Sequence, residues 1–348
     1  MSRSPTDARG LWEPAGVYLN TASYGLPPRP GWEALQAALS DWQGGRTSWE
    51  GWGESAEASR ASWARIVGVP VETVAIGATV SGLVGAVAAS VPDGARVLGC
   101  DVEFASLLFP FLVQERRGIS VRLVAPGELA GAIDGSTDVV AFSAVQMATG
   151  EVADVPAIVA AARAHGAMTV CDATQACGWL PIDGSQLDVV VASAYKWMMS
   201  PRGSAFMAIA PERLDAIVPT AAGWYAGEDV HKSYFGPPLR LAKSARRHDT
   251  SPAWFSWVGT APALALIEEI GVDAIHAHDV GLANRFRAGL GLDPSDSAIV
   301  SADAPGADAR LQAAGIVAAV RGGRLRVSWH VYNSEADVDR ALDVIAGA

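Results

Sequence analysis

Two side chains with complementary chemistry follow neighbouring apolar segments of this sequence. Asp172 comes directly after Met168–Cys171, and Lys196 comes shortly after Val189–Ala192. Burial beside apolar walls lowers the pKa of a lysine, which makes its amine a nucleophile for carbonyl chemistry. A carboxylate can hold a protonated pyridine nitrogen, so the two groups together indicate a pyridoxal cofactor. A buried ion pair between Asp172 and Lys196 is the structural alternative.

The segments that carry these residues belong to an alternating strand and helix pattern. Short apolar runs separated by amphipathic stretches are typical of a parallel sheet covered on both faces. Ligands bind at the carboxyl ends of such strands, where we expect Asp172 and Lys196 to lie together. The expected strands are Thr73–Ile76, Arg96–Gly99, Ser120–Val124, Val139–Ser143, Met168–Cys171, Val189–Ala192 and Ala205–Ile209; the expected helices include Ser81–Ser90, Leu107–Arg117 and Val155–His165.

The strand Ala205–Ile209 follows Lys196 after the short turn Pro201-Arg202-Gly203. A parallel crossover needs a dozen or more residues, so this strand should enter the sheet antiparallel. Farther along, a long helical stretch from Ala253 to Gly289 leads into Ala298–Ala348, whose strand, helix, strand, helix pattern predicts a smaller α+β domain. We therefore expect an N-terminal segment (1–31) packed on the small domain, a large cofactor-binding domain (32–228) and a small C-terminal domain (229–348).

Composition excludes several functional classes. The net charge is −11, and no run of Lys or Arg favours binding to nucleic acid or to an anionic membrane. No apolar run reaches the roughly 20 residues of a membrane helix, and the N-terminus has no apolar signal-peptide region. The three cysteines form no CxxC pair, and no histidine pattern predicts a metal site. We expect a cytoplasmic protein without metal that acts on a small molecule.

Five segments extend the pattern around Asp172 and Lys196. They read SAYKWMMSPRG, CDATQACG, IGATVSG, VEFASLLFPF and SPAW. Together they resemble the class V aminotransferase family of fold-type I pyridoxal-phosphate enzymes, which includes cysteine desulfurases, kynureninases and isopenicillin N epimerase-like proteins. The resemblance implies a mostly parallel seven-stranded sheet, a smaller α+β C-terminal domain, pyridoxal 5′-phosphate as cofactor and a homodimer.

The resemblance also implies an enzyme that acts on an amino acid or related amine through an external aldimine, and an aminotransferase is the expected activity. A C–S or β-lyase or an epimerase on the same fold is the alternative. A non-catalytic pyridoxal-phosphate-binding relative is the alternative from another class. Desulfurases carry a mobile cysteine late in the chain, whereas this sequence has none after Cys177, so a persulfide-forming desulfurase is disfavoured.

Roles on the cofactor follow from the resemblance residue by residue. Lys196 matches the Schiff-base lysine and general base, and Asp172 matches the partner of the pyridine nitrogen. Gln175 matches the amide that hydrogen-bonds the phenolic oxygen, while Ser193 and Tyr195 match phosphate contacts.

Further contacts are implied at two loops. Thr79, preceded by Ala78, begins a helix where relatives bind phosphate, although a plain N-cap is the alternative. Phe104 matches the ring that stacks on the pyridine, with a core phenylalanine as the alternative. Ser251, or its neighbour Thr250, matches the hydroxyl that reaches the phosphate of the other subunit.

On the substrate side, Arg326 matches the arginine that grips the α-carboxylate, with Arg321 and Arg324 as alternatives. Gln146 and Asn20 are further candidates for substrate binding, although a plain loop amide explains Gln146 nearly as well. His330 lies close to Arg326 in the sequence and is interpreted as a surface or core residue.

Overall fold

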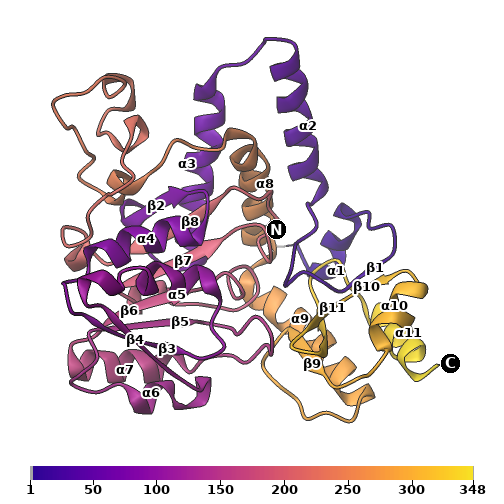
Figure 1. Ribbon diagram of the computed structural model, residues 1–348. Coiled ribbons are helices and arrows are strands. Elements are labelled where there is room, and N and C mark those ends of the chain that lie inside the picture. Colours follow the sequence, from indigo (N-terminus) through magenta and orange to yellow (C-terminus); the bar gives the residue numbers. More distant parts are fainter. Residues whose placement is uncertain (1–2, 348) are drawn as a thin grey trace.

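The computed structural model describes residues 3–347 (Figure 1). A seven-stranded sheet forms its centre, in the order β2-β8-β7-β6-β5-β3-β4. Its strands are β2 (Val74–Gly77), β3 (Arg96–Cys100), β4 (Ser120–Val124), β5 (Val139–Ser143), β6 (Met168–Asp172), β7 (Val189–Ser193) and β8 (Ala205–Ile209). The mostly parallel α/β fold predicted from the sequence is confirmed.

Pairing within the sheet follows the length of each connection. β4, β3, β5, β6 and β7 pair in parallel, whereas β8 pairs antiparallel with both β7 and β2. The predicted antiparallel entry of Ala205–Ile209 is confirmed. Every residue of β5, β7 and β8 is buried, which explains why these strands read as continuous apolar runs without alternation.

Helices cover both faces of the sheet. One apolar cluster packs α4 (Val80–Ser90) and α5 (Ala105–Leu112) on one face, and a second packs α3 (Trp49–Ile66), α7 (Val155–His165) and α8 (Trp254–Ile270) on the other. α8 also packs along α2 (Arg29–Gln43), which forms a tall hairpin with α3 (Figure 1).

The expected long helix from Ala253 to Gly289 is two helices. α8 ends at Ile270, Gly271 takes a φ of +90°, and α9 (Val272–Gly289) begins directly after it. A left-handed φ suits glycine and interrupts the helical hydrogen bonds, so the direction of the chain changes at this residue.

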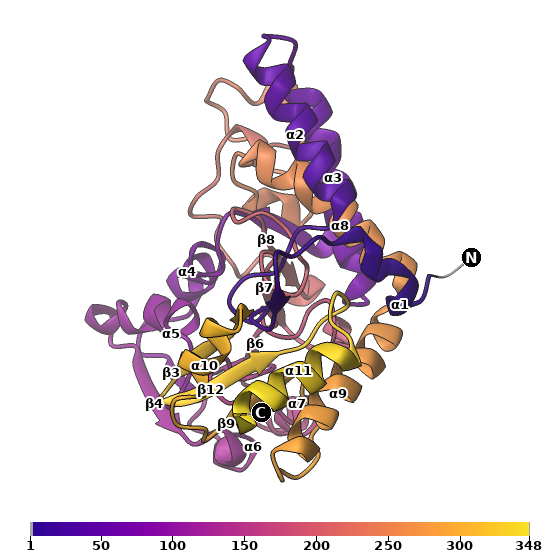
Figure 2. The same cartoon turned by 90° about the vertical axis from the view of Figure 1, so that its right-hand side faces the viewer.

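The last part of the chain builds two small sheets beside α9. β9 (Ile299–Ala302), β12 (Arg324–Ser328) and β11 (Ala319–Arg321) form an antiparallel sheet. β1 (Val17–Tyr18), from the N-terminal segment, pairs in parallel with β10 (Ile316–Val317), so segments from both parts of the chain share one small sheet. Figure 2 shows β12 and α9 of the C-terminal part from the side that faces them. The remaining helices are α1 (Pro5–Ala8), α6 (Leu129–Ala132), α10 (Ala307–Ala313) and α11 (Glu335–Ala346).

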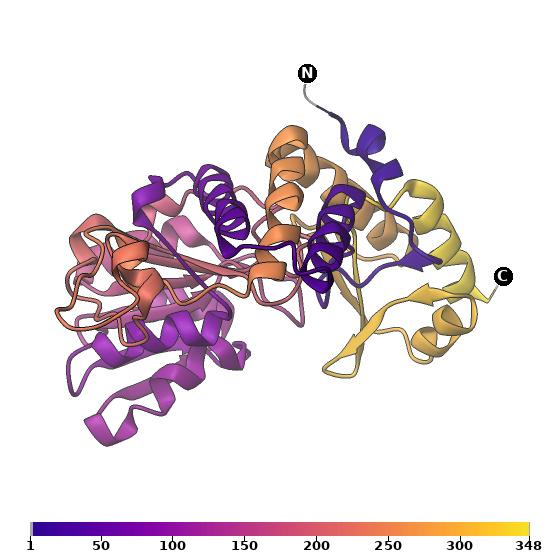
Figure 3. The ribbon, with the colours of Figure 1, turned by 90° about the horizontal axis from the view of Figure 1, so that it is seen from above.

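Seen from above, this C-terminal part and the N-terminal segment lie beside the sheet, with α2 and α8 between them (Figure 3). The division at residues 31 and 228 stays a prediction. Among residues 3–347, no helix combines the length and apolar character that crossing a bilayer requires.

Candidate active site

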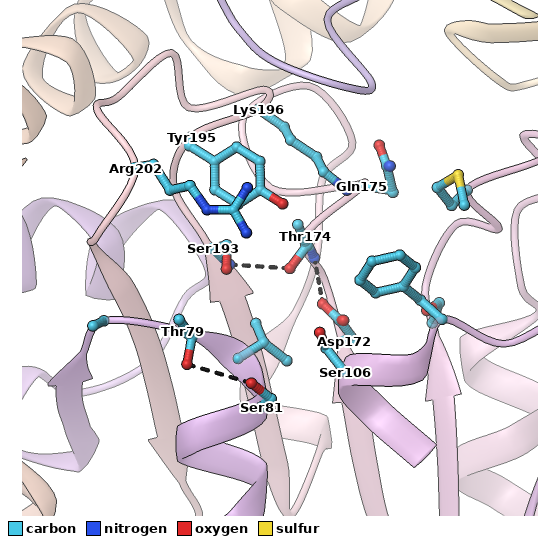
Figure 4. A pocket seen from close by; sticks show the side chains of 15 residues that line it. Thr79, Ser81, Ser106, Asp172, Thr174, Gln175, Ser193, Tyr195, Lys196 and Arg202 are labelled. Carbon is cyan, nitrogen blue, oxygen red and sulfur yellow. Dashed lines mark hydrogen bonds between the residues drawn. The ribbon is translucent and has the colours of Figure 1, made fainter. Parts of the chain in front are cut away.

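A cavity opens at the carboxyl ends of β6 and β7, beside the starts of α4 and α5 (Figure 4). Parallel strands place the residues that follow them at one edge of the sheet, so Asp172 and Lys196 reach the same space. The lining residues include eight that the sequence predicted, namely Ala78, Thr79, Phe104, Asp172, Gln175, Ser193, Tyr195 and Lys196.

Lys196 is buried with its amine toward this cavity. Only 6% of the residue is exposed. Burial is the main cause that lowers the pKa of its ammonium to about 8; Asp172 opposes the shift, and the charges of Arg326 and Arg202 add to it. Its Nζ lies 5.5 Å from the ring centre of Phe104. A lysine with this pKa carries a sizeable fraction of free amine near neutral pH.

Asp172 lies deep in the cavity with one oxygen fixed. Its Oδ1 accepts a hydrogen bond of 2.8 Å from the backbone N–H of Thr174. Burial raises the pKa of this carboxyl, against the opposing effects of Thr174 and Lys196. No ion pair joins Asp172 and Lys196 among the residues that the structure describes, so the simple buried pair is not what the fold forms.

One end of the cavity is suited to an anion. Thr79 caps α4, because its Oγ1 accepts from the N–H of Gly82 at 3.2 Å. The hydroxyls of Ser81 and Ser193 line the same end. Arg202 joins them, with its guanidinium 4.8 Å from the ring centre of Tyr195. Helix N–H groups, hydroxyls and a guanidinium together favour a phosphate.

Phe104 lies on the opposite side of the cavity and is held there by its neighbour. The carboxylate of Glu103 accepts from the N–H of Phe104 at 3.0 Å and from the N–H of Ser143 at 2.8 Å. Because Phe104 is 40% exposed, the alternative of a core phenylalanine is wrong. Phe104 lines the cavity, where its ring can cover a planar ligand.

The amide of Gln175 is oriented by two partners. Its Oε1 accepts from the indole N–H of Trp197 at 2.8 Å, and its Nε2 donates to the carbonyl of Ala22 at 2.9 Å. An amide nitrogen carries two N–H groups, so one of them stays available to an acceptor in the cavity.

Arg326 is fully buried without an acidic partner in the described residues. Its guanidinium donates to the carbonyl of Met147 at 2.8 Å and to the hydroxyl of Ser23 at 2.6 Å, with Asn20 Oδ1 at 3.3 Å. Its Nε has no hydrogen-bond partner. Burial and the charge of Arg321 lower the pKa of Arg326 to about 10. A buried guanidinium that lacks a carboxylate is a site for an anionic ligand.

Other predicted residues do not line the cavity. Gln146 is buried and donates to Glu103 at 3.3 Å. Ser251 is exposed and Thr250 half-buried. Sequence reasoning also missed seven lining residues, and all of them except Ser143 and Met147 lie within the quoted segments. The seven are Val80, Ser81, Ser106, Ser143, Met147, Thr174 and Arg202.

The sequence model of the family described as "Aminotransferase class-V" matches residues 77–305. The chain belongs to the class-V aminotransferase family. An uncharacterised aminotransferase, YcbU of Bacillus subtilis, is 27% identical, with 86% of this chain and 85% of the relative covered. Isopenicillin N epimerase of Streptomyces clavuligerus is 28% identical, with 98% of each chain covered.

Solved structures share the fold of this class-V family member. A complex of the cystine C–S lyase C-DES with cysteine persulfide superposes with a TM-score of 0.87 at 21% identity, covering 97% of this chain and 99% of that one. Apo cysteine desulfurase from Thermococcus onnurineus superposes with a TM-score of 0.86 at 21% identity, and both chains are covered completely. These likenesses confirm the predicted fold type.

The class-V family member is a pyridoxal-phosphate-dependent enzyme, an aminotransferase or a lyase. Its own residues fit that cofactor. Within residues 3–347, a buried amine faces the cavity without an ion pair and a carboxylate keeps Oδ2 free of protein donors, while hydroxyls with Arg202 form an anion-binding end. These groups complement an aldehyde, a pyridine nitrogen and a phosphate respectively.

Proposed function

We propose that this enzyme acts on an amino acid or related amine, as an aminotransferase, and that Lys196 is the lysine that carries the cofactor. The observation that supports this most strongly is the meeting of Lys196 and Asp172 in one cavity without an ion pair. When bound, pyridoxal phosphate supplies an aldehyde carbon and an electron-accepting ring.

Lys196 has two tasks in this proposal. Its amine, of which the lowered pKa leaves a larger fraction uncharged, would hold the cofactor at its aldehyde carbon. When an amine substrate is bound, Nζ of Lys196 would be the base that takes the proton from Cα of the substrate. Asp172 would accept a hydrogen bond from the protonated ring nitrogen of the cofactor, and burial of the carboxylate would strengthen this bond.

The remaining cavity residues position the cofactor. Gln175 would donate its second N–H to the ring hydroxyl oxygen of the cofactor, and Phe104 would pack against the ring. Thr79, Ser193 and Tyr195, together with Ala78 and Arg202, form the phosphate end.

Arg326 binds the α-carboxylate of the substrate in this proposal. A carboxylate would satisfy the Nε that has no partner and would neutralise a buried charge. Asn20 and Ser23 hold the guanidinium in place. Gln146 acts indirectly, through its hydrogen bond to Glu103.

A lyase or epimerase on the same residues is the second candidate, favoured by the full-length similarity to isopenicillin N epimerase. Cys100, Cys171 and Cys177 are all buried and none lines the cavity. Burial raises the pKa of Cys100 and of Cys177 to about 12, which disfavours thiolate chemistry. In a C–S lyase reaction, the sulfur would therefore leave as part of the substrate's own leaving group and would not pass to a cysteine of the chain.

We also propose a cytoplasmic homodimer. Ser251 is exposed and lies outside the cavity of its own chain, as expected of a residue that contacts a partner subunit's phosphate. Thr250, with its half-buried side chain, is the other candidate for this contact.

Reduction with borohydride tests the cofactor assignment. The chain has three lysines, Lys196, Lys232 and Lys243, so mass mapping of the reduced adduct distinguishes them cleanly. We expect the label on Lys196 and unchanged labelling in a Lys232→Arg, Lys243→Arg control. A label elsewhere, or full turnover by Lys196→Ala, would refute the proposal.

A screen of amino acids and keto acids then separates the activities. A new keto acid paired with a new amine indicates transamination, ammonia with a keto acid indicates elimination, and exchange of configuration indicates epimerisation. A protein that retains the cofactor but turns over none of them would be a binding relative.

A further inference from the structure

A buried acid–base pair lies behind the cavity, outside the set of residues that line it. His330 Nδ1 is 2.7 Å from Asp279 Oδ2, and both side chains are fully buried. Asp279 comes from α9, and His330 follows β12. The cofactor chemistry proposed above does not use either residue.

Both ring nitrogens of His330 face acceptors. Nδ1 faces the carboxylate of Asp279, and Nε2 lies 2.9 Å from the backbone carbonyl of Trp197. A backbone carbonyl only accepts hydrogen bonds, so Nε2 of His330 donates to Trp197, and one proton is shared between Nδ1 and the carboxyl group of Asp279. Three further groups surround the pair: His278 Nδ1 lies 2.9 Å from Asp279 Oδ1, and the rings of Tyr332 and Trp197 pack against His330.

Trp197 connects this pair to the cofactor site in two ways. It is the next residue after Lys196, so the hydrogen bond to its carbonyl fixes the backbone that carries the lysine. Its indole N–H donates to Gln175 Oε1 at 2.8 Å. A shift of Trp197 would therefore move the lysine and release the amide together.

We propose that His330, oriented by Asp279, is a positioning residue that holds the Lys196–Trp197 backbone and, through the Trp197 indole, the amide of Gln175. The contact also joins the C-terminal part of the chain to the segment between β7 and β8. This inference rests on the proposed role of Lys196 as the cofactor lysine.

Two substitutions separate the two hydrogen bonds. In His330→Gln the side-chain amide reaches the place of Nε2 and keeps a donor for Trp197, whereas in His330→Asn the amide lies near Nδ1 and keeps only the contact with Asp279. The measurements on the holoenzyme are the visible absorbance of the bound cofactor as a function of pH, the rate of cofactor loss, and kcat and KM.

We expect His330→Asn to move the pH at which the absorbance changes, to speed cofactor loss about tenfold, and to lower kcat about tenfold with little change in KM, as a small misplacement of a reacting group does. His330→Gln should stay within about threefold of the wild type in both rates. A purely structural role predicts lower thermal stability in both variants with an unmoved absorbance profile.

An unmoved profile in a folded His330→Asn, or equal shifts in the two variants, would overturn the proposal. If His330→Asn does not fold, nitrogen-15 NMR of histidine-labelled wild-type holoenzyme decides instead, with the His330→Gln spectrum assigning the signal. A His330 ring with a proton on Nε2 is required, and a ring that carries no proton on Nε2 would refute the proposal. A borohydride label on Lys196 combined with a silent His330→Asn would refute this inference alone and leave the proposed function standing.

Discussion

Gly25 lies directly against the backbone of Lys196. Its N–H donates to the carbonyl of Tyr195 at 2.9 Å, and a Cβ on Gly25 would overlap the carbonyl oxygen of Lys196. A backbone atom cannot swing aside as a flexible side chain can, so any larger residue at this position must displace the chain that carries the lysine.

Gly25→Ala should therefore weaken cofactor binding. We expect an increase of about tenfold in the dissociation constant, together with a lower thermal midpoint, because the Lys196 backbone must move. Titration of the apoenzyme with pyridoxal phosphate measures the first effect. Gly10→Ala is the matched control, since a Cβ there meets nothing within 4 Å. Equal affinities for the wild type and Gly25→Ala would contradict the prediction.

Lys196 should destabilise the apoenzyme near neutral pH. Its folded-state pKa of about 8 lies below the ordinary value of 10.5, so the unfolded chain binds the proton more tightly. The free energy of unfolding therefore rises as pH increases from about 8 to 10.5. Below that window the charged amine lowers the free energy of unfolding by about 3 kcal/mol. Lys196→Met should therefore stabilise the apoenzyme at neutral pH by up to this amount.

Urea unfolding of the two apoenzymes across this pH range measures the difference, which should shrink as pH rises. The exposed Lys232→Met serves as the control and should change little. A Lys196→Met apoenzyme that is no more stable than the wild type would contradict the prediction that the buried charged amine lowers the free energy of unfolding.

His248 should make the fold sensitive to acid. The residue is buried, neither ring nitrogen has a hydrogen-bond partner in the described part of the chain, and burial lowers its pKa from 6.5 to about 4. The unfolded state binds the proton more readily, so stability is lost as pH falls from 6.5 towards 4. In His248→Leu the thermal midpoint of unfolding should depend less on pH over this window. His165→Leu, at an exposed site, should keep the pH dependence of the wild type.

Removing only one member of the buried ion pair between Arg60 and Asp249 should lower the free energy of unfolding strongly. Arg60 Nη2 lies 2.6 Å from Asp249 Oδ2. Asp249 Oδ1 also accepts from the N–H of Ile76 at 2.8 Å, and Ile76 lies in β2, the strand that leads to Thr79. Arg60→Met leaves a buried carboxylate without its main partner, so we expect a loss of about 3–5 kcal/mol in the free energy of unfolding, measured with urea. Arg96→Met, which breaks an exposed pair with Asp138, is the control and should have little effect. Similar losses in both variants would contradict the argument.

Short-range patterns predicted most of the sheet and much of the cavity. β4, β5, β8 and α7 have the predicted bounds, since apolar runs and helical spacing are local properties of the sequence. Asp172 and Lys196 meet because neighbouring parallel strands end at one edge, a relationship that spacing alone predicts.

Features that depend on tertiary contacts were not predictable in this way. Nothing in the sequence around Gly271 marks it as the end of α8 more strongly than other helix glycines, and its left-handed φ follows from packing. The orientation of Gln146 towards Glu103 also depends on a partner 43 residues away. Arg202 could have been predicted as a lining residue, because the short turn Pro201-Arg202-Gly203 keeps it at the same edge of the sheet as Lys196.

The hydrogen bond between Ser23 and Arg326 joins residues that lie 303 positions apart. During synthesis the segment with Ser23 emerges from the ribosome early, and the segment with Arg326 emerges only when the chain is nearly complete. The central sheet can therefore fold and position Lys196 before Arg326 has been synthesised. A truncated or stalled product would therefore bear the lysine, the carboxylate and the anion-binding end, yet lack Arg326, the cation that we propose to distinguish an amino acid from any other primary amine.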